Sequence, residues 1–454
     1  TIKDHYSLAS FFADLADRGF NGNKLPTDRP PEIQIHTDGN SLKLELLSKQ
    51  IDQTLSVEKQ SELKNLQDRK GKLSRSLRKA EDANKTQWQE KINRINQQIA
   101  QVAKPAVLQK YRKLVKEKKE VEDKGRWTMV SQAVKPRVMR VLPRGNWMDD
   151  SGPIVLPAVP EFLGKIDSDK KRLDRLDLAN WLTDTEKGIG LLNARVLANR
   201  IWYLLFGKGL APDLTDFGGQ GTPPEHPELL DNLAISLVEK DWDIKAFIKD
   251  ILLSRTYRQA SLPPEGHKTF QLARRLPAEF VRDNTLAVSG LLVDKIGGPS
   301  VKPFQPTGYY RHLNFPKRTY EVDSGESQWR RGLYVHWQRQ FLHPMLKAFD
   351  APSREECSAE RPQSNTPLAA LVLLNDPTFL EAAKSFAQKI TTHGGDTFET
   401  KLTYAFEEAL SRSPDEFEQE TLASLFTQHN NKAGENWTPI ARAVLNLAET
   451  NLRR

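Results

Sequence analysis

Residues 42–123 constrain the fold most, because this long segment contains one glycine, Gly71, and one proline, Pro105. It is rich in Lys, Glu, Gln and Leu, which favour helices. Apolar residues recur at heptad-like spacing, at Leu66, Leu73 and Leu77 and again at Ile92, Ile95, Ile99 and Val102. With a turn at Asp82–Asn84, the pattern predicts a long antiparallel helical hairpin packed as a coiled coil. A single long helix, whose apolar seam needs a partner, is the alternative.

The positive charge of the chain belongs mainly to this helical segment. The 454 residues carry a net charge of +8, and about 21 basic and 12 acidic residues lie between Lys43 and Lys124. A basic protein invites comparison with nucleic-acid-binding proteins. Here the signs are mixed and aromatic residues are few, which is typical of a solvated coiled-coil face. We therefore predict no nucleic-acid partner.

The composition excludes several other classes. Apolar residues make up 38% and charged residues 28% of the chain, which is typical of a globular protein. No apolar run is long enough to predict a membrane span. Cys357 is the only cysteine, so the chain has no internal disulfide, no C-x-x-C-H haem motif and no cysteine zinc site. The chain has no signal-peptide pattern and begins at Thr1, so we expect it to be processed or cut from a longer protein.

The remaining patterns predict a mainly α fold. We expect a multi-helix globular domain that carries the hairpin insert and a few short β-strands. A short helix, in which Tyr6, Leu8, Phe11, Phe12 and Leu15 fall at helix spacing, is predicted to stop at Arg18-Gly19. Strands are predicted at Glu32–His36, Trp127–Val130 and Arg137–Leu142. Helices are predicted at residues 193–206, 228–240, 244–253, 278–292, 366–374, 377–390, 398–410, 415–429 and 436–452. The predicted segments are 1–41, the hairpin 42–123, an extended wrapping segment 124–171 and the helical domain 172–454.

A series of ordered motifs carries a family resemblance. They are A-N-R-I-W at 198–202, F-G-x-G-L at 206–210, D-F-G-x-Q-G-x-P-P-x-H-P-E-L-L at 216–230, S-R-T-Y-R-Q at 254–259, G-G-P-S-V at 297–301, H-P-M at 343–345 and N-D-P at 375–377. Over about Arg172 to Leu452 the chain resembles the planctomycete DUF1553 family, also called PSD1. The family's reaction is unsettled, so the resemblance implies a setting and an architecture rather than a mechanism.

The resemblance also extends to the first residues. Family members commonly carry an upstream DUF1549 domain with a C-x-x-C-H segment, and residues 1–41 resemble a remnant of that domain. This chain lacks the motif, so no cofactor is expected within it. Haem c is expected on a missing N-terminal portion, on a cytochrome c domain or on a partner chain. Because covalent haem attachment occurs outside the cytoplasm, the resemblance implies a periplasmic or otherwise extracytoplasmic protein.

The first candidate site is the loop from Asp216 to His226. Its glycines and prolines hold the backbone in special conformations, and an acid and a histidine ten residues apart suit proton transfer or a metal. We predict His226 as a catalytic residue and Asp216 as a substrate-binding residue. The alternative is a rigid loop that leads into a helix. Further binding candidates are Asn199 on the preceding helix and, at the end of another helix, Tyr257 and Arg258.

The second candidate site lies between Tyr334 and Asn365, where titratable and aromatic residues are dense. Aromatic faces beside arginines and acids suit a glycan or polyol, because stacking combines with paired polar contacts. The predicted catalytic residues are His343, Asp350, Arg354 and Glu355. The predicted binding residues are Tyr334, Trp337, Arg361 and Asn365. The alternative is a set of ion pairs that pin loops between helices.

Metal and thiol chemistry receive less support from the sequence. His343 and Met345 are ligand types for haem or copper, but no standard ligand spacing surrounds them, so no metal site is predicted. No cysteine-enzyme signature surrounds Cys357, which is predicted to be a buried structural thiol.

Two functions from different classes remain open. One is a redox or carbohydrate-modifying enzyme that is assembled with a haem domain and acts on a glycan or polyol. The other is a non-catalytic scaffold or binding module of the cell envelope, with the coiled coil mediating assembly or a homo-oligomer. An enzyme should gather His226, Tyr257, His343 and Arg361 in one pocket, whereas a scaffold should leave them scattered.

Overall fold

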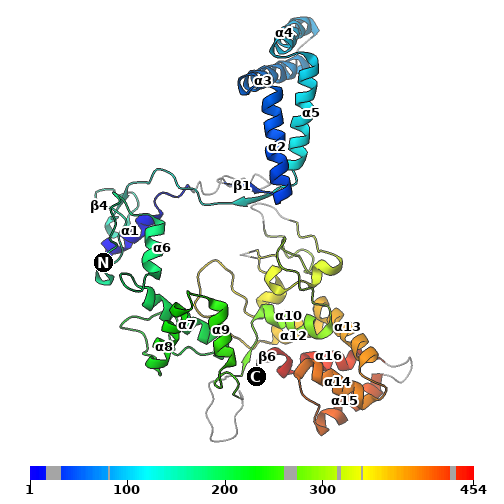
Figure 1. Cartoon of the computed structure of the whole chain (residues 1–454). Helices are drawn as coiled ribbons and strands as arrows, with labels where there is room; N and C mark the ends of the chain where they lie inside the picture. Colours follow the sequence, from blue (N-terminus) through cyan, green and yellow to red (C-terminus); the bar gives the residue numbers. More distant parts are fainter. Residues whose placement is uncertain are drawn as a thin grey trace. The chain divides into compact units, whose positions relative to one another are not determined.

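The computed structural model of the chain describes residues 1–16, 32–79, 82–259, 273–313, 319–338, 341–429 and 436–453. The described chain is mainly α-helical with short strand pairs, as the sequence predicts (Figure 1). Contacts divide it into two compact units, residues 12–138 and residues 1–11 with 139–454. These bounds differ from the predicted segments, which follow composition and family resemblance and stay predictions. The predicted helix stop at Arg18-Gly19 lies outside the described residues.

The described residues of the unit 12–138 form four helices between two paired strands. They are β1 (Glu32–Ile35), α2 (Asp38–Thr54), α3 (Val57–Lys79), α4 (Asp82–Val102), α5 (Pro105–Glu122) and β2 (Arg126–Met129). β1 and β2 pair antiparallel, with Ile33 opposite Thr128. The predicted strand Trp127–Val130 is therefore present and shifted by one residue.

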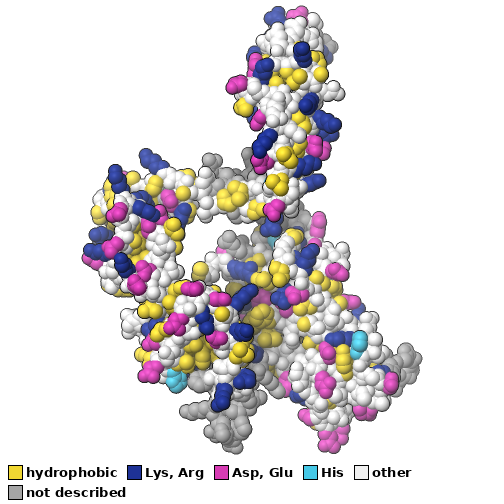
Figure 2. Space-filling view, viewed as in Figure 1, with side chains coloured by type: hydrophobic (Ala, Val, Ile, Leu, Met, Phe, Trp, Pro, Cys, Tyr) yellow, Lys and Arg dark blue, Asp and Glu magenta, His cyan; other side chains and the backbone are white. Residues whose placement is uncertain are grey.

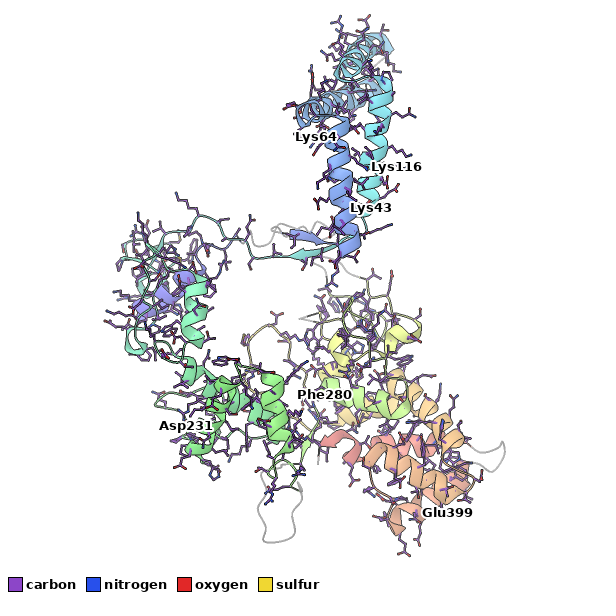
Figure 3. The ribbon with its side chains drawn as sticks, viewed as in Figure 1. Lys43, Lys64, Lys116, Asp231, Phe280 and Glu399 are labelled. Carbon is purple, nitrogen blue, oxygen red and sulfur yellow. The ribbon has the colours of Figure 1, made fainter. Side chains whose placement is uncertain are left out.

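The helices of this unit pack as two pairs, α2 with α5 and α3 with α4 (Figure 1). Lys43 near the start of α2 forms an ion pair of 3.1 Å with Glu117 near the end of α5, so these helices are antiparallel (Figure 3). A buried apolar cluster joins the pairs and includes Leu55, Leu63, Leu66, Ile95, Ile99, Val102 and Leu108. The two heptad runs therefore face each other within one chain.

The helical segment differs from the predicted single hairpin in two ways. It is broken where Leu55 is extended and where Lys104, also extended, precedes Pro105 at the start of α5. The predicted turn at Asp82–Asn84 is wrong, because these residues begin α4. Coiled-coil packing itself stays a prediction.

The other unit begins and ends with short elements around a helical body. Its elements are α1 (Ile2–Ala9), β3 (Met139–Arg140), β4 (Ile154–Val155), α6 (Arg175–Thr183), α7 (Gly190–Phe206), α8 (Pro227–Glu239), α9 (Ile244–Leu253), β5 (Arg274–Arg275), α10 (Ala278–Ser289), α11 (Pro344–Ala348), α12 (Pro367–Asn375), α13 (Pro377–His393), α14 (Phe398–Leu410), α15 (Glu416–His429), α16 (Thr438–Asn446) and β6 (Leu452–Arg453). β3 pairs with β4, and β5 pairs with β6. Among the described residues, no helix is both long and apolar enough to cross a membrane.

Two predicted helices are shorter than expected. The helix predicted at 278–292 ends at Ser289 because Gly290 takes a left-handed conformation with φ of 76°. The helix predicted at 436–452 ends at Asn446, where Leu447 becomes extended. Thr450 then donates a hydrogen bond of 2.7 Å to the Val444 carbonyl, and the chain continues into β6. Of the strand predicted at Arg137–Leu142, only β3 forms.

Among the described residues of this unit, one apolar cluster joins Phe11 to Leu178 and Trp181 of α6, and three more lie among α7–α16. Of these three, the first lies between α7, α8 and α9 around Trp202 and Phe206, whose rings stack at 4.0 Å. The second surrounds α10 and α11 and contains Val281 and Met345. The third joins α13, α14 and α16 around Phe386. The first two of these three clusters carry the predicted site residues.

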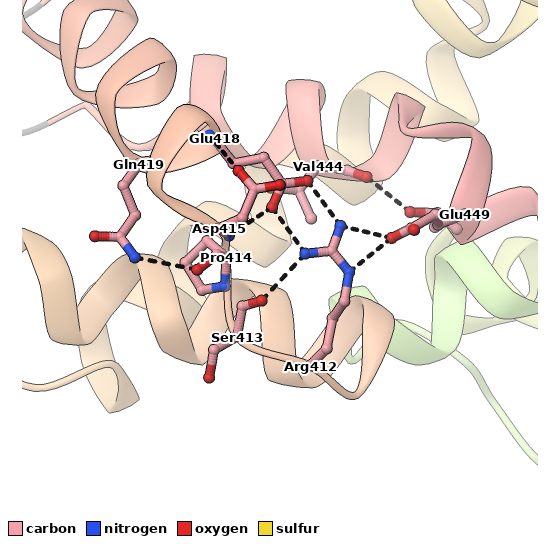
Figure 4. A network of polar contacts seen from close by, with 9 residues as sticks. Arg412, Ser413, Pro414, Asp415, Glu418, Gln419, Val444 and Glu449 are labelled. Carbon is pink, nitrogen blue, oxygen red and sulfur yellow. Dashed lines mark hydrogen bonds and ion pairs between the residues drawn. The ribbon is translucent and has the colours of Figure 1, made fainter. Parts of the chain in front are cut away.

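A polar network fastens the C-terminal helices together (Figure 4). Arg412, just after α14, donates two hydrogen bonds of 2.7 Å to Glu418 of α15. It also donates hydrogen bonds of 2.9 and 2.7 Å to Glu449. The hydrogen bonds to Glu418, followed by those to Glu449, raise the pKa of Arg412 above its usual value despite partial burial. The network links α14, α15 and the segment after α16.

Candidate functional site

The contacts of the predicted site residues divide them into two groups within one unit. Asn199, Asp216, His226, Tyr257 and Arg258 accompany helices α7–α9. The second group accompanies α10 and α11 and consists of Tyr334, Trp337, His343, Asp350, Arg354, Glu355, Arg361 and Asn365. Each group is described from the residues upward.

Asn199 of α7 holds the loop that follows its own helix. Its side chain is fully buried, donates a hydrogen bond of 2.9 Å to the Ala211 carbonyl and accepts one of 2.9 Å from the Ala211 N–H. A Cβ atom on Gly209 would lie 2.9 Å from the Asn199 amide, so this close approach requires glycine. These contacts give Asn199 a structural role, and its predicted role in binding stays without support from them.

The loop from Asp216 to His226 is held by its own backbone. Asp216 accepts a hydrogen bond of 2.6 Å from the Gly218 N–H, and a Cβ on Gly221 would lie 2.1 Å from the Asp216 carbonyl oxygen. Glu225 forms an ion pair of 2.5 Å with Lys208, and His226 is exposed immediately before α8. These contacts fix the loop locally, and the roles of His226 and Asp216 stay predictions.

Tyr257 packs against the α7–α9 cluster. Its ring meets Phe206 edge to face at 5.7 Å, and the Arg453 guanidinium lies 4.7 Å from the ring centre. Arg258, the next residue, is exposed. Tyr257 therefore connects the end of the chain with α7, and Arg258 is accessible.

In the second group, Asp350 is the centre of a polar contact between two loops. It accepts hydrogen bonds of 2.5 Å from Arg275 Nη2 and of 2.7 Å from both the backbone N–H and the hydroxyl of Ser364. Burial by itself would raise the pKa of Asp350, but the hydrogen bonds from Ser364 and Arg275 outweigh it and lower this pKa. Asp350 is therefore an ionised anchor for the loop 350–366.

Arg361 and Tyr334 fasten the same region to α10 and to the loop at Gly297. Arg361 Nη1 lies 2.8 Å from a carboxylate oxygen of the buried Glu279 on α10. The Tyr334 hydroxyl accepts a hydrogen bond of 2.8 Å from the Gly297 N–H, and the Arg330 guanidinium lies 3.9 Å from the Tyr334 ring centre. Both residues have tight structural partners.

Trp337 and Arg354 form a stacked pair in this group. The Arg354 guanidinium lies 3.5 Å from the centre of the half-buried Trp337 ring, and the indole N–H donates a hydrogen bond of 3.4 Å to the Ser353 carbonyl. Arg354 is exposed and has a positive φ of 59°, which is uncommon for a residue with a side chain. Glu355 and Asn365 are exposed on the same loop. An accessible cation on an aromatic face is thus present at the predicted second site.

His343 lies beneath this surface. It is 2% exposed, and its Nε2 lies 2.7 Å from the Phe304 carbonyl oxygen. Burial, reinforced by the positive charge of Arg282, lowers the pKa of His343 to about 4 despite the hydrogen bond to Phe304. The imidazole is therefore neutral near pH 7 and supports the loop at Phe304.

Sequence reasoning missed Arg282, the most deeply buried cation in the second group. It is 1% exposed and donates a hydrogen bond of 2.5 Å to the Arg330 carbonyl and another to the Gln328 carbonyl. Burial lowers its pKa to about 10. Ala278, Arg282 and Leu286 are spaced by four residues, so a charged residue on the apolar face of the predicted helix was the available signal.

The absence of a metal site stays a prediction, whereas the structure contradicts the prediction for Cys357. The described residues contain no group of three or more His, Cys, Asp or Glu side chains placed to hold a metal ion. Cys357 is exposed, so the prediction of a buried thiol is wrong. Its loop carries charged residues on both sides of it and faces solvent.

One comparison with known proteins finds a match. The family model described as PSD1, protein of unknown function (DUF1553), matches residues 174–426, which is more than half of the chain. No curated protein and no solved structure matches the chain. The matched residues include α6–α14 and most of α15, and hence both groups of predicted site residues.

Proposed function

This chain belongs to the PSD1 family of proteins of unknown function (DUF1553), and on this premise we propose that it binds a glycan or polyol as part of an extracytoplasmic haem-protein assembly. The observation that carries the proposal is the Arg354 guanidinium stacked at 3.5 Å on Trp337. Such a pair offers an aromatic body to sugar C–H groups and directed N–H donors to hydroxyl or carboxylate oxygens.

The surroundings of the pair suit a ligand with many hydroxyl groups. Asp350, Arg361 and Ser364 lie on the same short loop as Arg354 and place donors and acceptors there. This loop is held by Arg275 of β5 and by Glu279 of α10. Their mutual contacts fix the side chains before a ligand arrives, which reduces the entropy lost on binding. Arg354, Glu355 and Asn365 are exposed and supply adaptable contacts.

Binding has more support than catalysis by the predicted catalytic residues. His343 is buried, and Asp350 is engaged by Arg275 and Ser364. A general acid or base needs access to the proton that it transfers. If the assembly performs a redox reaction on the glycan, the electrons would pass through a haem c on an N-terminal portion, a cytochrome c domain or a partner chain. The family resemblance to planctomycete proteins supports that arrangement and an extracytoplasmic location.

The test is calorimetric titration of the purified chain with a panel of neutral and uronate-containing oligosaccharides and simple polyols. We expect at least one ligand to bind, and Trp337→Ala and Arg354→Ala each to weaken it about tenfold, since stacking with directed hydrogen bonds contributes roughly 1–2 kcal/mol. Trp147→Ala is the matched control, because Trp147 is 80% exposed and lies outside the loop. Failure of every ligand to bind, or equal losses in all three variants, would refute the proposal.

A scaffold is the second candidate, favoured by the separate compact unit of residues 12–138. In that case the unit docks a partner, and the variants above leave assembly unchanged. A homo-oligomer through a coiled coil has weaker support, because Leu63, Leu66 and Ile95 of the seam are already buried within one chain. Light scattering of the chain at increasing concentration tests for such an oligomer.

A further inference from the structure

The second half of α3 concentrates positive charge without compensating acids. Residues 69–79 contain six basic residues and no acidic one. Arg69, Lys72, Arg75 and Arg78 are exposed, and no ion pair within the described residues involves them. Elsewhere in the same unit, Lys43, Lys49, Lys116 and Lys118 have acidic partners. We name Arg69, Lys72, Arg75 and Arg78 the α3 basic face.

The α3 basic face is kept on the surface by the packing of the same helix. Leu63 and Leu66 of α3 are buried against Ile95 and Ile99 of α4. Residues spaced by three along a helix progress around it by about 60° per step, so the four cations wind over about 180° of α3 on the side away from this seam. Neighbouring cations repel one another, and an anion that spans them relieves this repulsion.

A polar groove begins at the start of this face. It has a volume of about 640 Å³ between α3 and α4, and its lining includes Asn65, Arg69, Gln98 and Gln101. Glu58 and Glu62 line the same groove on the preceding turns of α3. An anionic group is therefore favoured at the Arg69 end, while amides of the groove are suited to hydroxyl groups.

From this arrangement we propose that the groove and the α3 basic face bind an acidic polysaccharide, a polymer with repeated carboxylate or sulfate groups. Its hydroxyls would meet Asn65, Gln98 and Gln101, and its anionic groups would meet Arg69, Lys72, Arg75 and Arg78 in succession along the helix. Arginine provides paired donors that match carboxylate and sulfate oxygens. Lys and Arg side chains extend over the surface of the helices α2–α5 in Figure 2.

Two other polyanions fit the surface less well. A membrane-bound helix inserts large apolar side chains beside its cations, whereas Leu63 and Leu66 of α3 are buried against α4. A single-stranded nucleic acid needs aromatic platforms on which bases stack. The aromatic side chain within α3 and α4 is Trp88 of α4, which is half-buried and has the Lys91 ammonium 4.5 Å from its ring centre.

The experiment compares the full chain with two variants that each lose four positive charges. One carries Arg69→Gln, Lys72→Gln, Arg75→Gln and Arg78→Gln. The control carries Lys110→Gln, Arg112→Gln, Lys113→Gln and Lys116→Gln on α5. Binding of polygalacturonate, dextran sulfate, a single-stranded DNA oligonucleotide and phosphatidylglycerol-containing vesicles is measured at several salt concentrations. Circular dichroism checks that both variants remain folded.

We expect wild-type protein to bind at least one of the two polysaccharides, with affinity that falls as salt rises. The α3 variant should lose about tenfold in affinity and show a shallower salt dependence, and the α5 control should lose less than about twofold. Equal losses in both variants would mean a general charge attraction and overturn the proposal. Tighter binding to DNA or vesicles, or no polysaccharide binding, would overturn it as well. Trp337→Ala should not alter this binding, which separates it from the proposed function.

Discussion

Buried polar side chains in this protein mostly serve neighbouring backbone groups. Asn199 pairs with Ala211, His343 with Phe304, and Arg282 with the carbonyls of Gln328 and Arg330. Backbone groups in loops lack the regular partners of a helix, and when they are buried they need other hydrogen-bond partners. Each of these side chains supplies such a partner and so fixes its loop. Asn199 and His343, which the sequence predicts as site residues, therefore have contacts that are structural. The predicted site residues that stay exposed are His226, Arg258, Arg354, Glu355, Arg361 and Asn365.

His343 gives a prediction about pH. Its pKa is about 4 in the folded protein and near 6.5 when unfolded, so between these values the unfolded chain binds a proton that the folded one does not. The contribution of His343 to the free energy of unfolding should therefore be fully present above about pH 6.5. It should decrease as the pH falls toward 4, by at most about 3 kcal/mol.

Urea unfolding at several pH values measures this effect. His343→Gln keeps a donor for the Phe304 carbonyl and should flatten the decrease between pH 6.5 and 4. His393→Gln is the control, because His393 is exposed. An unchanged slope in the His343 variant would contradict the assigned role.

Asn199→Ala tests whether the hydrogen bonds between Asn199 and Ala211 stabilise the loop after α7. The substitution removes two hydrogen bonds and leaves the Ala211 N–H and carbonyl without them in a buried place, which should destabilise the fold by about 2–4 kcal/mol. The exposed Asn365→Ala should change stability by less than about 0.5 kcal/mol. The midpoints of thermal unfolding of the two variants are compared. Similar midpoints would contradict a stabilising role of the Asn199 hydrogen bonds.

At the scale of elements, capping residues determine where a helix begins or ends. Apolar faces determine which helices pack together. Asp174, with Asp177, forms a capping box at α6, and Gly207 ends α7 with φ of 91°. In α2–α5, breaks at Leu55 and Lys104 convert one predicted hairpin into two packed pairs. These breaks let both pairs share one apolar cluster.

Leu63→Ala tests that shared cluster. Leu63 is 1% exposed, and its truncation leaves a cavity that should destabilise residues 12–138 by about 2–4 kcal/mol. Leu46→Ala on α2 should be nearly neutral, because Leu46 is 59% exposed. Hydrogen exchange should show lower protection across α3 and α4 in the first variant alone. Unchanged exchange there would mean that the cluster does not stabilise the pair.

At the scale of the whole molecule, contacts group into two units that each have their own apolar core. Units with separate cores tend to unfold separately. We expect two calorimetric transitions, with Leu63→Ala shifting one and Phe386→Ala, at a fully buried position of α13, shifting the other. A single transition that moves equally in both variants would contradict independent unfolding.

Much of the element pattern could be predicted from the sequence. The helices α9 and α14 begin and end at the predicted residues, because Asp243 and Thr397 supply caps and the apolar spacing is regular. The family resemblance over the helical domain was likewise carried by ordered motifs, and the PSD1 match confirms it. For the candidate site, the sequence indicated the dense polar loop but not which side chains would be buried.

The sequence by itself determined the mainly α fold, the places of most helices in residues 193–452 and the family, because capping and apolar periodicity act over a few residues. Only the tertiary structure decided that α3 packs on α4 within the chain, that His343 is buried and that Trp337 stacks with Arg354. Burial and side-chain partners depend on residues far apart in the chain. Periodicity indicates that one face of a helix is apolar, but it does not indicate which other helix packs against that face.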